Sequence, residues 1–246
     1  MALDALSVAG GTVLAGGVLI GAVTNRVTGL GFSLVCSPVM VLVLGPRDGV
    51  RLLNMVSVAV TLTNIVTSWR HVRWKDWLTM LVPGIVATPL AVWAAHRLSD
   101  RVLLLGAGTV TIASAGLLLS GRTLAFVRGP AGAAGAGAVS ATMNVVAGLS
   151  GPSVAMYGLN AGWPPEEFRP TLQLYFLVLN AVAVASLGPV RPPGWLAVAI
   201  VVAVLGGLVI GRIVARRVSA ARVRTAVLTV VVAGGLTAVI RGLVTR

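Results

Sequence analysis

The stretch Gly29-Leu-Gly-Phe-Ser-Leu-Val-Cys-Ser-Pro38 returns in altered form half a chain later as Gly148-Leu-Ser-Gly-Pro-Ser-Val-Ala-Met-Tyr157. Each copy follows an asparagine, Asn25 or Asn144, in a nearly uncharged stretch, and each opens an apolar run too short to cross a bilayer. A duplicated, glycine-broken segment of this kind in a hydrophobic chain is typical of secondary transporters whose binding site lies between two repeats. The pair of glycine motifs therefore predicts both the fold class and the place of the site.

The composition places the chain in a membrane. Its 246 residues are 57% hydrophobic and 10% charged, whereas a soluble domain carries roughly 25% charged residues. The apolar runs are too many for one buried core, and short basic segments separate them, which indicates a multi-span membrane protein. The net charge of +13 has no solvated domain to present it. We interpret the basic residues as loop residues that orient the chain and contact lipid headgroups, and we expect no nucleic-acid partner.

The two halves of the chain are related in sequence. Asn25 aligns with Asn144, and the glycine motifs that follow them align as well, at an offset near 119 residues. A helical repeat of this length is a duplicated unit rather than a solenoid repeat of roughly 20–50 residues. The alignment predicts an N-terminal repeat over residues 1–122 and a C-terminal repeat over residues 128–246.

Ten apolar runs predict an all-α integral membrane fold. A membrane-spanning helix needs ~20 residues, and the runs at 31–44 and 152–162 fall short of this length directly after the glycine motifs. We therefore expect each repeat to be a glycine-broken hairpin with a short helix plus three transmembrane helices. The runs lie at 5–24, 31–44, 52–69, 77–95, 102–120, 130–147, 152–162, 171–188, 195–215 and 223–244.

The number of spans predicts that the two repeats are inverted. A hairpin returns the chain to its starting side and three spans give an odd number of crossings, so the second half enters from the opposite face. Inversion also brings the basic loops 70–75 and 212–224 to one side, which the positive-inside rule places in the cytoplasm. We therefore expect a multi-pass protein of the cell (inner) membrane with both termini on the outer face.

The positions of the acidic residues favour an anion as the substrate. All six carboxylates lie at the ends of apolar runs or in loops, whereas an Asp or Glu inside the membrane is the usual carrier of protons or cations. The glycine motifs offer what an anion needs. A broken backbone exposes N–H groups, and the short helix that follows directs its positive N-terminal end at the break.

The candidate substrate-binding residues surround the two breaks, where amide, hydroxyl, thiol and backbone N–H groups could donate hydrogen bonds. They are Asn25, Thr28, Gly29, Gly31, Ser33, Cys36, Asn144, Gly148, Ser150, Gly151 and Ser153. Two aligned motifs are hard to explain by helix packing alone, so we interpret them as functional, and the glycine-rich run Gly129–Gly137 as a packing surface. Replacement of Gly31 or Gly151 by Leu is expected to abolish transport while leaving membrane insertion intact.

Other polar residues in the apolar runs have two interpretations each. Arg26 either binds substrate or extends to the membrane interface, and we favour the interface. We interpret Asn54, Asn64, Gln173 and Asn180 as hydrogen-bonding residues between helices rather than as site residues.

The chain offers no pattern for catalysis, for a metal or for a cofactor. Cys36 is the only cysteine, which excludes an intramolecular disulfide and a cysteine-based metal cluster. The two histidines flank the ends of apolar runs, where no Ser and carboxylate complete a hydrolase triad, and no phosphate-binding loop occurs. We expect no enzymatic activity, no metal and no cofactor.

The glycine motifs resemble those of the TauE/SafE family of sulfite-exporter-like membrane proteins. That family has two related halves, each with a Gly-x-Gly-Gly-Gly type of motif that a proline follows five residues later. Gly29, Gly31 and Pro38 match these places in the first copy, and Gly148 and Gly151 are kept in the second. The resemblance covers nearly the whole chain and implies transport of sulfite, organosulfonates or other small organic anions.

The chain departs from the family pattern in both copies of the motif. Phe32 and Ser33 stand where two glycines are expected, and Ser150 and Pro152 alter the second copy. Because these residues change both the backbone freedom and the donors at each break, we expect the two halves of the site to be unequal.

We therefore predict a secondary transporter or exporter of a small anion, such as sulfite or a sulfonate, that works by alternating access. Three alternatives stay open: a cation-coupled carrier of another small solute, an anion channel, and a non-transporting membrane subunit of an enzyme complex. The expected partners are the anionic substrate and the lipid bilayer, and a homodimer is an open alternative.

Overall fold

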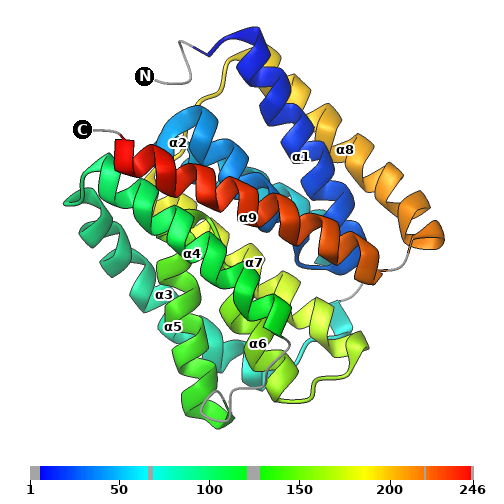
Figure 1. Ribbon diagram of the computed structural model, residues 1–246. Coiled ribbons are helices and arrows are strands. Elements are labelled where there is room, and N and C mark those ends of the chain that lie inside the picture. Colours follow the sequence, from blue (N-terminus) through cyan, green and yellow to red (C-terminus); the bar gives the residue numbers. More distant parts are fainter. Residues whose placement is uncertain (1–5, 66–68, 121–127, 219, 245–246) are drawn as a thin grey trace.

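The computed structural model describes residues 6–65, 69–120, 128–218 and 220–244, and these ranges contain helices and no strand. The predicted all-α fold is thereby confirmed. Residues 1, 122 and 246, which bound the predicted repeats, and residue 219 of the basic loop 212–224 lie outside the described residues. The elements are α1 (Val8–Thr28), α2 (Gly31–Ile65), the 3-10 turn η1 (Trp69–His71), α3 (Trp74–His96), α4 (Asp100–Ser120), α5 (Gly129–Ala147), α6 (Gly151–Asn160), α7 (Pro165–Leu187), α8 (Gly194–Arg217) and α9 (Ala220–Val244) (Figure 1).

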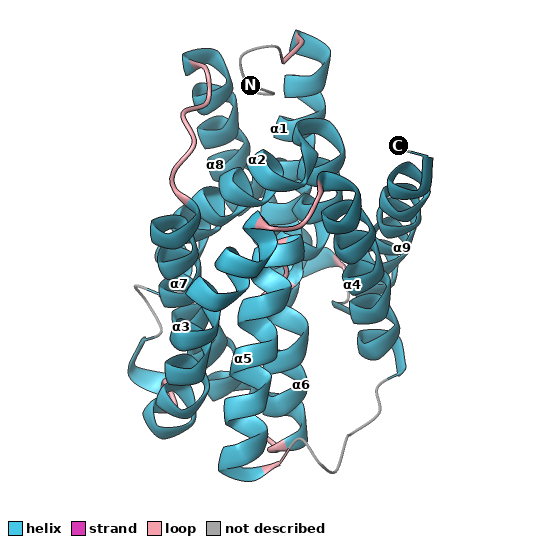
Figure 2. Ribbon diagram, turned by 90° about the vertical axis from the view of Figure 1, so that its left-hand side faces the viewer, coloured by secondary structure: helices cyan, strands magenta, loops and turns pink. Residues whose placement is uncertain are grey.

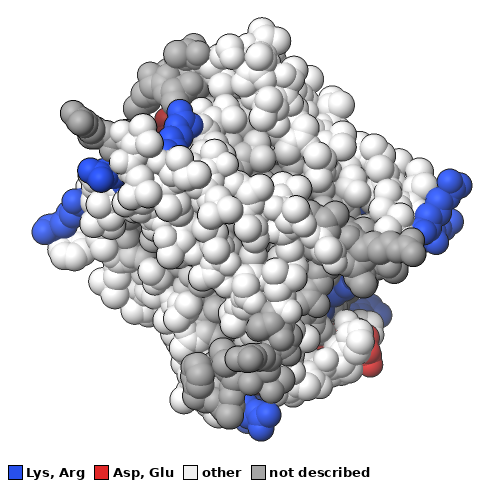
Figure 3. All heavy atoms as spheres, viewed as in Figure 1, with Lys and Arg blue, Asp and Glu red and all other residues white. Residues whose placement is uncertain are grey.

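Seven of the described helices are long and apolar enough to span a membrane: α1, α2, α3, α4, α7, α8 and α9. Large apolar side chains cover their outer faces, and on α8 Val198, Val202, Leu205 and Val209 are all more than half exposed. Apolar surface of this extent is stable against lipid rather than against water. The face that α4 and α9 form is uncharged across its middle, with Lys and Arg at its edges (Figure 3). The chain is a multi-pass membrane protein.

The acidic residues that the structure describes lie near the beginnings of helices. Asp76 lies in the first turn of α3, Asp100 in the first turn of α4, and Glu166 and Glu167 in the first turn of α7. The fifth, Asp48, follows a break within α2. The positive end of a helix dipole stabilises a negative charge at such places, which keeps these carboxylates at the ends of the spans.

The breaks of the two halves have the same backbone geometry. α1 ends at a left-handed Gly29 (φ 83°), and α5 ends at a left-handed Gly148 (φ 66°). In each case the glycine N–H donates to the carbonyl of the asparagine four residues earlier, Asn25 at 2.8 Å and Asn144 at 2.7 Å. A residue with a side chain is strained at such a φ. Glycine therefore ends both helices and lets the chain turn back.

Each break produces a helical hairpin. The first part of α2, residues 31–44, runs back along α1, so that the Cys36 thiol donates to the carbonyl of Gly17 at 3.4 Å. α6 runs back along α5, and the Ser153 hydroxyl donates to the carbonyl of Ala136 at 3.1 Å. The short helices after the two glycine motifs are thus packed on the helices that precede them.

α2 is broken once within its length, at Gly45 (φ 82°, ψ 169°). The apolar pattern alone predicts a loop up to residue 51, whereas the helix resumes directly at Pro46. Proline is favourable in the first turn of a helix because its missing N–H has no partner there. Arg51 pairs with Asp48 one turn earlier at 3.5 Å. This charged segment is therefore the start of the second part of α2, residues 46–65.

In each of the three most extensive helix pairs, a helix of one half packs on a helix of the other half. α1 packs on α8, α5 packs on α3, and α4 packs on α9, and each pair lies side by side in Figures 1 and 2. Glycines allow the closest approaches. A Cβ on Gly207 of α8 would stand 2.8 Å from the carbonyl oxygen of Leu19, and a Cβ on Gly137 of α5 would stand 1.9 Å from that of Met80. At Gly137 the glycine-rich run is a packing surface, as interpreted from the sequence.

Candidate functional site

The two glycine breaks meet inside the molecule. Ser37, in the first part of α2, donates a hydrogen bond to the carbonyl of Ala147, the last residue of α5. Ser140 of α5 donates to the carbonyl of Ser150 in the second break at 2.6 Å. Leu149 is fully buried in an apolar cluster that the first part of α2 shares with α4 and α9. The repeat thus brings its two motifs into one neighbourhood.

A cavity of about 20 Å³ lies between the breaks, and we call it the central cavity. This volume holds about one water molecule. Hydroxyl and amide groups from both halves contribute to its wall beside apolar side chains. The cavity is lined by Asn25, Leu30, Phe32, Ser33, Ser57, Val60, Thr61, Ser150, Phe176 and Asn180.

A larger hollow of about 280 Å³ adjoins the central cavity, and we call it the open hollow. The two spaces share Asn25 as a lining residue. The last residues of α1, the end of α2 and the first turns of α7 form the wall. The open hollow is lined by Asn25, Arg26, Gly29, Asn64, Pro165, Glu166, Arg169, Pro170 and Gln173.

Gln173 fixes the orientation of the Asn25 amide. Its Nε2 donates to the carbonyl of Gly29 at 2.7 Å and to Asn25 Oδ1 at 3.5 Å. A main-chain carbonyl only accepts hydrogen bonds, so Gln173 presents its NH₂ group here, and the Asn25 atom that faces this group is the oxygen. Asn25 Nδ2 is buried without a hydrogen-bond partner among the described residues. Such a group costs about 1–3 kcal/mol, so the fold retains a buried donor where the two cavities meet.

Asn144, the counterpart of Asn25, has an acceptor for both N–H groups of its amide. Its Nδ2 donates to Asn54 Oδ1 at 2.8 Å and to Asn180 Oδ1 at 3.1 Å. Asn54 in turn donates to a carbonyl of its own helix at 2.9 Å. At the offset of 119 residues, Asn54 is the counterpart of Gln173. Equivalent positions thus build a donor without a partner in one half and a closed network in the other.

The open hollow carries a net positive charge. Arg26 donates to Asn64 Oδ1 at 3.4 Å, and Arg169 donates to the carbonyl of Val27 at 2.6 Å. Each of these hydrogen bonds uses one of the five N–H groups of a guanidinium. The only carboxylate among the lining residues of the open hollow is Glu166. Guanidinium groups held in this way bind an oxyanion through their other N–H groups.

A group of ion pairs joins α3 to α7 beside the open hollow. Arg73, next to the first turn of α3, pairs with Asp76 and with Glu167, each at 2.7 Å. The hydrogen bonds that Arg73 donates, first to Asp76 and then to Glu167, raise the pKa of Arg73. Gly211, near the basic end of α8, packs on the Arg26 side chain. Both predicted basic segments therefore approach the end of the molecule that holds the open hollow.

Four of the eleven predicted site residues line these cavities. Asn25 and Gly29 line the open hollow, and Asn25, Ser33 and Ser150 line the central cavity. The other seven support the breaks or the packing around them, as when the Thr28 hydroxyl accepts from the N–H of Leu30 at 3.3 Å. These seven are Thr28, Gly31, Cys36, Asn144, Gly148, Gly151 and Ser153.

Several polar lining residues were not among the predicted site residues. Gln173 and Asn180 form hydrogen bonds between helices, as interpreted from the sequence, and each also lines a cavity. The repeat carries a signal for both, because Gln173 aligns with Asn54 and Asn180 aligns with Thr61. A polar residue at the same place in two apolar helices is a stronger indication than one in a single helix. Arg169 has no such signal, because its counterpart is an apolar valine.

The sequence profile of the family described as sulfite exporter TauE/SafE matches residues 13–238. The chain belongs to the TauE/SafE family. The matched range contains both glycine breaks and every residue that lines the open hollow and the central cavity. The resemblance seen in the motifs is therefore confirmed, and this TauE/SafE chain is a membrane transporter. No curated protein and no solved structure matches it.

Proposed function

We propose that the chain transports a small oxyanion of the sulfite or sulfonate class, and that the anion binds at Asn25. The observation that carries the proposal is the buried Asn25 Nδ2, a donor without a partner between a cationic hollow and a cavity lined by both glycine breaks. An oxyanion offers acceptor oxygens on several sides. It could bridge this amide and the Arg26 or Arg169 guanidinium, and its charge makes these hydrogen bonds stronger than those of a neutral solute.

The size of the central cavity supports a small substrate. At about 20 Å³ it holds about one water, so an anion must displace its walls before it passes between the breaks. Ser33 and Ser150 lie in this wall, one from each half, and their hydroxyls could take over the hydrogen bonds of the anion as it moves inward. Closure of the inner cavity while the outer hollow is open is what alternating access requires.

The directions of equivalent helices support inverted repeats. The second part of α2 ends at the open hollow with Asn64, whereas its counterpart α7 begins there with Pro165. Equivalent helices that run in opposite directions are expected for an inverted repeat. We propose on this basis that residues 1–122 and 128–246 are two inverted repeats.

The basic segments support an orientation for this transporter. If the segments 70–75 and 212–224 face the cytoplasm of a cell (inner) membrane, as the positive-inside rule predicts, the open hollow faces the cytoplasm as well. The Arg73–Glu167 pair lies next to that hollow. In this state of the transporter, the Asn25 site would then be reached from the cytoplasm.

Counterflow in proteoliposomes tests the proposed function. We expect saturable exchange of sulfite or sulfonates, and we expect Asn25→Asp to lower it at least tenfold, because the new carboxylate replaces a donor and repels the anion. Asn160→Asp is the matched control, since Asn160 lines neither cavity and the charge change is the same. Exchange that does not saturate would indicate a channel, dependence on Na⁺ would indicate a cation-coupled carrier, and equal flux in both variants would refute the site.

A further inference from the structure

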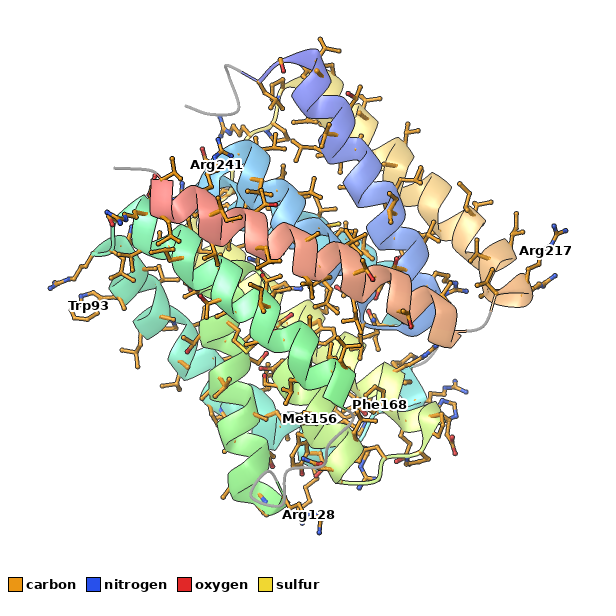
Figure 4. The ribbon with its side chains drawn as sticks, in the orientation of Figure 1. Trp93, Arg128, Met156, Phe168, Arg217 and Arg241 are labelled. Atoms are coloured by element: carbon orange, nitrogen blue, oxygen red, sulfur yellow. The ribbon has the colours of Figure 1, made fainter. Side chains whose placement is uncertain are left out.

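A second hollow lies at the opposite end of the same helices, and we call it the closed hollow. α7 begins at the open hollow with Pro165 and ends at the closed hollow with Leu187, and the second part of α2 connects the two hollows in the reverse direction. At ~1.5 Å per helical residue, the 23 residues of α7 separate the two hollows by about the thickness of a bilayer. Figure 4 labels Trp93 at the end of α3 next to the closed hollow, and Arg217 at the end of α8 on the other side of the view.

The two hollows are made by equivalent residues of the two repeats. Pro46 and Arg47 line the closed hollow, and the residues 119 positions later line the open hollow. Three further residues of the closed hollow have a counterpart at the same offset among the residues that line the open hollow. The five pairs are Pro46 with Pro165, Arg47 with Glu166, Val50 with Arg169, Arg51 with Pro170, and Val145 with Arg26.

Arg47 forms two hydrogen bonds at the closed hollow, and we call this arrangement the Arg47 clamp. Its Nε donates to Asp100 Oδ1 at 2.7 Å, and its Nη2 donates to the carbonyl of Leu98 at 2.7 Å. The two hydrogen bonds connect the start of the second part of α2 to Leu98, in the turn after α3, and to Asp100, the first residue of α4. The counterpart of Arg47 is Glu166, and a carboxylate cannot donate to a carbonyl in this way. The closed hollow has a volume of about 20 Å³, against about 280 Å³ for the open one.

We propose that the closed hollow is a second vestibule for the same anion, and that the Arg47 clamp keeps it shut while the open hollow is accessible. The proposal rests on the proposed transport function. Arg47, Arg51 and His96 line this space, so an anion that has passed between the glycine breaks meets positively charged or donor side chains there. When the hydrogen bonds of the Arg47 clamp break, the closed hollow opens and the open hollow closes.

The accessibility of single cysteines tests the second vestibule. Cys36, the only cysteine, is fully buried and is replaced by Ala. Val146→Cys then reports on the closed hollow and Asn64→Cys on the open hollow. The probe is a cationic methanethiosulfonate that does not cross membranes, added to either side of sealed proteoliposomes. We expect rapid labelling of Asn64→Cys from one side and slow labelling of Val146→Cys from the other.

Release of the clamp should reverse this pattern. Arg47→Gln is expected to raise the labelling rate of Val146→Cys about fivefold and to lower that of Asn64→Cys. The factor is modest because Asp100 is 61% exposed and solvent screens such pairs. Asp100→Asn should act in the same direction, which guards against a folding defect in one variant. Arg51→Gln is the matched control, since it removes the same charge from the same hollow but pairs only within its own helix at 3.5 Å.

The outcomes separate this proposal from the proposed function. Normal anion counterflow together with an unchanged labelling rate in Arg47→Gln and Asp100→Asn would overturn the vestibule and leave the Asn25 site intact. Labelling of both reporters from the same side would overturn it as well. A reversed labelling pattern without any anion counterflow in the unaltered protein would support the clamp but refute the transport of small oxyanions.

Discussion

Asn25 and Asn144 occupy the same place in the two repeats but end in different hydrogen-bond arrangements. Two neighbouring positions differ between the repeats: Gln173 corresponds to Asn54, and Asn180, which accepts from Asn144, corresponds to Thr61. Gln173 has one more methylene than its counterpart Asn54 and reaches the carbonyl of Gly29 at 2.7 Å, whereas the Asn54 amide donates to its own helix. Gln173 therefore offers an NH₂ group to its asparagine, and Asn54 offers an oxygen. These two differences leave the Asn25 donor without a partner among the described residues and give the Asn144 donor two acceptors.

The substitution Gln173→Asn should weaken substrate binding. The shorter amide cannot reach Gly29, so the Asn25 amide loses the contact that fixes its orientation. We expect the concentration for half-maximal counterflow to rise about tenfold, which corresponds to ~1.4 kcal/mol and lies within the usual cost of an unmade buried hydrogen bond. An unchanged half-saturation concentration together with a lower melting temperature in detergent would contradict this role and leave Gln173 as a structural residue only.

At the scale of the elements, the two glycine breaks are alike in backbone and unlike in packing. Gly29 and Gly148 end their helices in the same left-handed conformation. The first glycine of each following helix differs in its surroundings. A Cβ on Gly31 would stand 1.9 Å from the Cγ2 methyl of Thr24, whereas a Cβ on Gly151 would find only Phe176, at 3.8 Å. The sequence-based prediction treats Gly31 and Gly151 as equal, and the structure gives a physical reason to distinguish them.

The pair Gly31→Ala and Gly151→Ala should therefore differ in stability. Thr24 is 3% exposed and its β-branched side chain has little rotamer freedom, so Gly31→Ala must shift the first part of α2 at a cost of about 1–3 kcal/mol. Gly151→Ala should leave the melting temperature in detergent nearly unchanged.

A double substitution checks the cause. Thr24→Ser removes the methyl group that the new Cβ meets, so Gly31→Ala combined with Thr24→Ser should recover a large part of the lost stability. Equal melting temperatures for the two single alanine variants, or no recovery in the double variant, would show that the close contact at Gly31 is not what limits this position.

At the scale of the whole molecule, helices of the two halves pack on each other, and each hollow is lined by residues of both repeats. The open hollow combines the end of α1 with the start of α7, and the closed hollow combines the second part of α2 with the ends of α3 and α7. α1 packs on α8 and α5 packs on α3, so these helix pairs join the two repeats directly.

Topology reporters test the orientation that follows from the basic segments. A green fluorescent protein inserted after Arg217 should fluoresce in bacterial cells, because we expect this segment in the cytoplasm. Alkaline phosphatase fused after residue 246 should be active, because we expect that terminus on the outer face. Exchange of the two reporters between the two places is the matched control. The reverse pattern of activities would place the open hollow on the outer face and would refute this orientation.

The sequence alone determined the membrane class, the all-α fold and the family. Membrane spans need long apolar runs with their charges at the ends, and a motif such as Gly29–Pro38 is local, so these properties can be read along the chain. The same local signal predicted Asn25, Gly29, Ser33 and Ser150, which line the two cavities.

Only the tertiary structure decided which of the two asparagines, Asn25 or Asn144, keeps a donor without a partner among the described residues, and which hollow is open. Both depend on residues from different helices meeting, such as Gln173 with Gly29, 144 positions apart, and Arg47 with Asp100, 53 positions apart. A repeat makes equivalent positions look equal in sequence. The contacts that break this symmetry exist only once the halves have packed against each other.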